Sequence, residues 1–136
     1  MTLHGWWCSL AAGVLLLSSC GAWADDRTPV VSLVASIANP QKYAAKKVLV
    51  LGFCSLEFED TAVYLHEEDY RRGLTTNSIW LDVPSVKPPT PNPVHESHCL
   101  VEATFSPKPA RNGREGRLER VTRLERWLSR AELEQR

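Results

Sequence analysis

The fold is decided by one stretch of sequence, Val48-Leu49-Val50-Leu51-Gly52-Phe53-Cys54-Ser55-Leu56-Glu57-Phe58. The stretch is long, apolar and β-rich, which predicts a strand. Gly52 lies inside it, and a glycine within a strand often marks a bulge or a sharp bend, as the closure of a small barrel requires. Residues 57–60 predict a turn and residues 61–66 a second strand. The two strands together predict a β-hairpin.

Further short elements follow from the pattern of apolar residues and breakers. Between the third and fourth predicted strands, residues 84–93 contain five prolines and predict an extended loop rather than a core element. The other predicted elements are a short N-terminal helix at residues 32–37, one helical turn at 67–73, strands at 77–83, 98–105 and 117–124, and a C-terminal helix at 125–135.

Five short strands with a bent first strand predict a mainly β fold, a small five-stranded OB-like barrel. In that architecture the first and fourth strands are neighbours. Cys54 lies on the first predicted strand and Cys99 on the fourth. The barrel therefore supports a Cys54–Cys99 disulfide, with two buried free thiols as the alternative.

Composition limits the classes of function. The 136 residues make one domain, and 43% hydrophobic residues are enough for a core. With 16 Lys and Arg against 16 Asp and Glu, the net charge is zero, which argues against a nucleic-acid partner. Residues 25–110 carry a net charge of −3 and residues 111–136 of +3. This basic tail fits either docking to an anionic surface or a helix laced with Arg–Glu pairs.

The N-terminal segment predicts export. Residues 1–24 contain no Lys, Arg, Asp or Glu, and residues 10–17 form an apolar run with the length of a signal-peptide core. An Ala-Trp-Ala site at 22–24 would release a soluble periplasmic protein. Alternatively, residues 17–20 resemble a lipobox in which Cys20 is lipidated, giving an outer-membrane lipoprotein. Either form leaves a single domain, residues 25–136.

Six short motifs together carry a resemblance to a known group of proteins. They are Asn39-Pro40-x-x-Tyr43-x-x-Lys46-x-Val48-x-Val50-x-Gly52, Glu57-Phe58-Glu59, Val63-Tyr64-Leu65, Ile79-Trp80-Leu81-Asp82, Val101-Glu102-Ala103-Thr104-Phe105 and Val121-Thr122-Arg123. With these motifs the chain resembles small exported bacterial proteins of the tRNA-anticodon-binding-like OB-fold kind. Ala45 stands where that group usually has a glycine. The resemblance implies a fold, but neither a catalytic residue nor tRNA binding.

Two constellations could carry chemistry. His95-x-x-His98-Cys99 offers two imidazoles and a thiol, with His66 as a further metal ligand if the fold brings it near. This spacing does not fix both histidines on one face, so we predict that they are solvated loop residues. The alternative is a periplasmic metal-binding protein that uses His95 and His98. The acidic clusters at residues 57–60 and 67–69 predict a solvated surface.

The sequence holds no nucleophile motif and no phosphate-binding glycine loop, which argues against an enzyme and predicts no cofactor. Most aromatic residues alternate with aliphatic ones and are expected in the core. OB barrels bind ligands on the face of the second and third strands, which by analogy favours Tyr64, His66 and Trp80 as ligand-binding residues. The predicted function is an exported, non-enzymatic module that binds an envelope protein or a small ligand.

Overall fold

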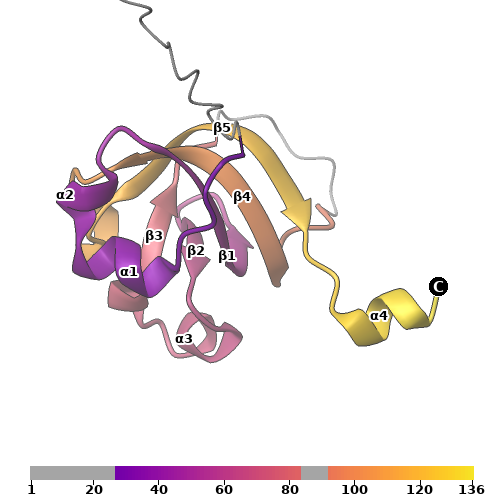
Figure 1. Ribbon diagram of the computed structural model, residues 1–136. Helices are drawn as coiled ribbons and strands as arrows, with labels where there is room; N and C mark the ends of the chain where they lie inside the picture. The colour runs from indigo at the N-terminus through magenta and orange to yellow at the C-terminus, as the bar shows by residue number, and fades with distance from the viewer. Residues whose placement is uncertain (1–26, 84–91) are drawn as a thin grey trace, which may run out of the picture.

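The computed structural model describes residues 27–83 and 92–136 and shows a small β-barrel with short helices around it (Figure 1). In chain order the elements are α1 (Leu33–Ala38), α2 (Pro40–Tyr43), β1 (Lys47–Leu56), β2 (Thr61–Tyr64), α3 (Glu67–Arg71), a 3-10 turn (Thr75–Asn77), β3 (Ser78–Leu81), β4 (Ser97–Ser106), a 3-10 turn (Arg111–Gly113), β5 (Arg117–Arg126) and α4 (Arg130–Glu134).

The five strands close into a barrel in the order β1-β2-β3-β5-β4, and β4 pairs with β1. Neighbouring strands are antiparallel except for the parallel pair of β3 with β5. The predicted five-stranded OB-like barrel is confirmed.

Strand β1 holds the barrel together because it pairs on both sides. Its residues 47–54 pair with β4, and its residues 53–56 pair with β2. Gly52 stands at this change of partner. A Cβ atom there would lie 2.5 Å from the carbonyl oxygen of Tyr64 and 2.6 Å from Cγ1 of Val63, so only glycine permits the close approach of β2.

Alternate residues of the strands fill the barrel interior, as the period of two along a strand requires. Leu33 of α1 belongs to the same cluster, so the first helix packs against the core. The cluster includes Val48, Val50, Cys54, Val63, Ile79, Leu81, Cys99, Val101, Ala103, Phe105 and Leu118.

A disulfide joins β1 to β4 inside this core. Cys54 and Cys99 are bonded, their Cα atoms lie 5.8 Å apart, and both side chains are buried. The predicted disulfide is thereby confirmed.

The C-terminal part differs from the expected long helix at residues 125–135. Strand β5 continues to Arg126, which pairs with Cys99, and the N–H of Trp127 donates to the carbonyl of His98. The helix α4 begins only at Arg130, where Ser129 and Glu132 form a capping box. The prediction of a long helix was wrong because strand pairing with β4 outcompetes helix formation over residues 125–127. Figure 1 shows α4 standing away from the barrel.

Arg–Glu pairs lace this C-terminal segment on both strand and helix. The pairs are Arg117–Glu119, Arg123–Glu125, Arg126–Glu132 and Arg130–Glu134. They support the second interpretation of the basic tail, although only the last pair lies within a helix.

Some predictions fall outside the described residues. These are the leader at 1–24 with its cleavage sites and Cys20, and most of the proline-rich loop at 84–93. None of the helices in the described ranges has the length and apolar character needed to cross a membrane.

Candidate functional site

The outer face of β1 and β2 carries a second, smaller apolar cluster. Phe53, Ala62 and Tyr64 are buried there, and Tyr70 of α3 packs against them. The Tyr70 ring centroid lies 5.5 Å from that of Phe53 and 5.5 Å from that of Tyr64. Helix α3 therefore covers the barrel face on which OB folds commonly bind their ligands.

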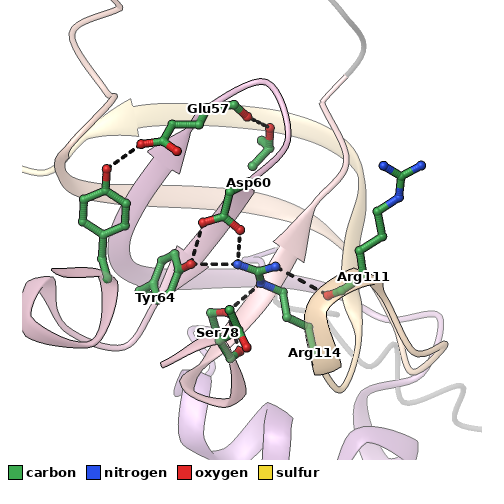
Figure 2. Close-up of polar contacts among 9 residues, drawn as sticks. Glu57, Asp60, Tyr64, Ser78, Arg111 and Arg114 are labelled. Atoms are coloured by element: carbon green, nitrogen blue, oxygen red, sulfur yellow. Dashed lines mark hydrogen bonds and ion pairs between the residues drawn. The ribbon is translucent and has the colours of Figure 1, made fainter. Parts of the chain in front are cut away.

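Arg114, which follows the 3-10 turn at 111–113, seals the other side of this cluster. Its side chain is 0% exposed. Its Nε donates to Oγ of Ser78 at 2.7 Å, and its Nη2 donates to the hydroxyl of Tyr64 at 2.8 Å and to a carboxylate oxygen of Asp60. Figure 2 shows the guanidinium group surrounded by Asp60, Tyr64, Ser78 and Arg111.

Every member of this network has a partner. The Tyr64 hydroxyl donates to Oδ2 of Asp60 at 2.6 Å, and the Ser78 hydroxyl donates to the carbonyl of Thr75 at 2.6 Å. Burial, together with the hydrogen bond to Asp60, raises the pKa of Tyr64 to about 12. The arginine also lies over the rings of Tyr64 and Trp80, 5.5 and 5.8 Å from their centroids. A buried charge requires such complete pairing.

The three residues expected to bind a ligand do not form one open surface. Tyr64 is 1% exposed and belongs to the internal packing of this face. Trp80 is half-buried beside Arg114, and His66 is exposed at the start of α3. A ligand could reach Tyr64 only by displacing α3 or Arg114.

Among the aromatic residues that the structure describes, the most exposed is Phe58, at the tip of the β1–β2 hairpin. Its side chain is 99% exposed, although aromatic residues were expected mainly in the core. Strand β1 ends at Leu56, so Phe58 lies beyond the alternating pattern, between Glu57 and Glu59. Acidic residues on both sides were the signal that this phenylalanine belongs to a turn.

The turn that carries Phe58 is held at its base. The N–H of Asp60 and the hydroxyl of Thr61 both donate to the carbonyl of Glu57, at 3.2 and 2.8 Å. Asp60 is in turn paired with Arg114. Figure 2 shows Glu57 and Asp60 on the same turn, with Asp60 directed toward the arginine. The buried network thus fixes the hairpin that presents Phe58.

The histidines expected as alternative metal ligands are not brought together. His98 is exposed and packs edge-on against Phe53, with centroids 5.6 Å apart. Nδ1 of His95 accepts a hydrogen bond from the N–H of Leu56 at 3.1 Å. Cys99 is used by the disulfide. Within the described ranges, the group of candidate ligand atoms that does converge belongs to Glu57, His95 and Glu96.

The fold and the disulfide define a class, a small disulfide-bonded OB-like barrel. No protein-family model, no curated protein and no solved structure matches the chain.

Proposed function

We propose that the protein is an exported, non-enzymatic binding module of the bacterial cell envelope, and that it binds a protein partner through the tip of the β1–β2 hairpin. The observation that carries this proposal is Phe58, a fully exposed aromatic side chain on a turn fixed from below. Aromatic anchors dominate the affinity of many protein interfaces. A rigid turn loses little conformational entropy when it binds, which favours affinity.

The charge of the turn indicates the chemistry of the partner. Glu59 is exposed next to Phe58, and no ion-pair partner accompanies it among the residues that the structure describes. The complementary surface is an apolar pocket for the phenyl ring, bordered by a basic side chain. The electrostatic match would select the partner and its orientation more than it would add affinity.

Two features support a role without catalysis. The thiols of Cys54 and Cys99 are joined in the disulfide and are therefore not available as nucleophiles. The buried polar network around Arg114 is internally satisfied, so its hydroxyl groups are engaged in structure.

Export is supported by the leader and by the disulfide, because structural disulfides persist in oxidising compartments. The test is the intact mass of the protein recovered from a Gram-negative host, with alkylation before and after reduction. A chain that begins at lipidated Cys20 or at Asp25, with Cys54 and Cys99 protected until reduction, supports the proposal. An unprocessed chain in which both cysteines react without reduction contradicts it.

Contact with a partner is tested by photo-crosslinking in cells. A benzophenone side chain replaces Phe58, which keeps the aromatic character, and the matched control carries it at Gln41, an exposed residue of α2. Gln41 lies before the first residue of β1, whereas the turn that carries Phe58 follows the last residue of β1. We expect one discrete protein adduct from position 58 and none from position 41. The same adduct from both positions, or none from either, would refute the contact.

A further inference from the structure

The second half of strand β5 is paired on one side only. Strand β4 pairs with β5 from Arg117 to Arg126, whereas the pairing with β3 is limited to the first two residues of β5. The last contact from β3 is the N–H of Asp82, which donates to the carbonyl of Leu118 at 2.9 Å. Beyond it, no residue that the structure describes pairs with this edge of β5, which continues toward α4 (Figure 1). An open strand edge is a template for a further strand.

The hydrogen-bond pattern determines which backbone groups face the open edge. The N–H of Trp127 donates to the carbonyl of His98 on β4 at 2.8 Å. In an antiparallel ladder alternate residues turn their backbone groups to the same neighbour, so Glu125 also faces β4. Leu124 and Arg126 therefore direct their N–H and C=O groups away from β4. Within the described ranges, these backbone groups have no hydrogen-bond partner.

The side chains of this half of the strand are self-complementary. Arg123 and Glu125 form an ion pair along the strand, and their side chains are still 47% and 54% exposed. Leu124 between them is partly buried and packs against the core. Edge strands are commonly protected by a bulge or by inward-pointing charges. The bulge of β5 lies between Glu119 and Arg123, so residues 123–126 stay in regular pairing with β4.

We propose that this edge pairs with the same edge of a second copy of the chain, in an antiparallel junction centred on Leu124. A two-fold axis there sets each Leu124 opposite its own counterpart and each Arg123 opposite Glu125 of the other copy. The two Leu124 residues would exchange N–H···O=C bonds, because both direct their backbone groups to the junction. The junction uses neither Phe58 nor its turn, so it is independent of the proposed function.

The neighbouring registers lack this match. An axis at Arg123 or at Glu125 would set two like charges directly opposite each other, which destabilises a strand pair. An axis at Arg126 would do the same at the end of the strand. An axis at Thr122 would place the bulge at Arg120, whose φ is 51°, inside the new ladder. Charge and backbone geometry therefore select a single register.

The test is sedimentation equilibrium of the purified chain from about 1 μM to about 1 mM, the range in which small interfaces assemble. We expect the mass to rise from that of one chain to that of two, because a single strand pair is a small interface that dissociates on dilution. Glu125→Arg and Arg123→Glu each set like charges opposite one another, and each should weaken the dimer at least about tenfold. The matched control is Glu68→Arg on α3, which makes the same charge change at an exposed ion pair and should dimerise as the unmodified chain does.

An equimolar mixture of the two charge variants tests the register itself. In the mixed junction, the two acidic positions of the Arg123→Glu chain face the two basic positions of the Glu125→Arg chain. We expect a mixed dimer at concentrations at which each variant alone is a single chain. Circular dichroism of each dilute variant should match that of the unmodified chain, since the Arg123–Glu125 pair is exposed and contributes little to folding.

Three outcomes would overturn the proposal. The mass of one chain at every concentration would show that the edge does not pair with a second copy, whether it stays open or another part of the chain covers it. A dimer that persists unchanged in both charge variants would place the junction elsewhere on the molecule. Loss of the dimer in the folded variants, without recovery in their mixture, would refute the register centred on Leu124.

Discussion

Arg114 and Asp60 are separated by 54 positions in the sequence and form an ion pair in which the arginine side chain is 0% exposed and the aspartate side chain 25% exposed. The pair joins the segment before β5 to the turn between β1 and β2. Because one partner is enclosed and the other reaches solvent, the two residues are not equivalent for stability.

Removing the acidic partner should be the more damaging change. Asp60→Asn leaves the guanidinium charge buried without a counter-charge, and we expect it to lower the free energy of unfolding by about 3 kcal/mol. Arg114→Met leaves a carboxylate that water can reach and fills the space, so about 1–2 kcal/mol is expected. Urea unfolding followed by tryptophan fluorescence measures both. Equal losses, or the reverse order, would show that the burial asymmetry does not govern stability.

Tyr64 should make the protein sensitive to alkaline pH. Burial and the hydrogen bond to Asp60 raise its pKa in the folded state to about 12, from 10.0. Below pH 10.0 both states keep the proton. Between 10.0 and about 12 only the unfolded state loses it, so stability falls as the pH rises. Unfolding free energies measured across this interval should fall less steeply in Tyr64→Phe. An identical slope in the variant would refute the assignment.

The disulfide should contribute substantially to stability. Cys54 and Cys99 are 45 positions apart, and closing a loop of that length stabilises a protein by about 3–4 kcal/mol in the chain-entropy model. Reductant added during urea unfolding should lower the midpoint accordingly. The Cys54→Ala, Cys99→Ala double variant is the control and should not respond to reductant. A urea midpoint of the unmodified chain that does not change with reductant would contradict this prediction.

Ala45 adopts a backbone conformation that favours glycine. Its φ is 59°, in the left-handed region, whereas φ of the preceding Ala44 is −51°. Ala45→Gly should therefore raise the free energy of unfolding by about 0.5–1 kcal/mol, and Ala44→Gly should lower it by a similar amount. Thermal unfolding of the two variants tests whether one substitution stabilises the protein and the other destabilises it. A loss of stability in Ala45→Gly would contradict the strain argument.

The barrel could be predicted because its signals are local. The alternation of residues 99–105 and the glycine at position 52 are visible in a short window, and the barrel topology then placed Cys54 beside Cys99. The end of β5 was missed because pairing with β4 is not local. Arg114 looked like one charge of a solvated basic tail, since no local pattern reveals that Asp60 lies beside it. The turn at residues 57–60 was predicted correctly, but the exposure of Phe58 was missed because aromatic residues were expected mainly in the core.

The central claim is that Phe58 is the anchor of a binding surface. The most direct measurement places the photo-crosslinker at Glu59 and compares chains that carry Phe or Ala at position 58. Phe58 is 99% exposed, so Phe58→Ala removes almost no folded-state packing and should unfold as the unmodified chain does. We predict that the adduct falls at least about tenfold, as expected for loss of an aromatic anchor. An adduct of unchanged yield from the folded Phe58→Ala chain would contradict the claim.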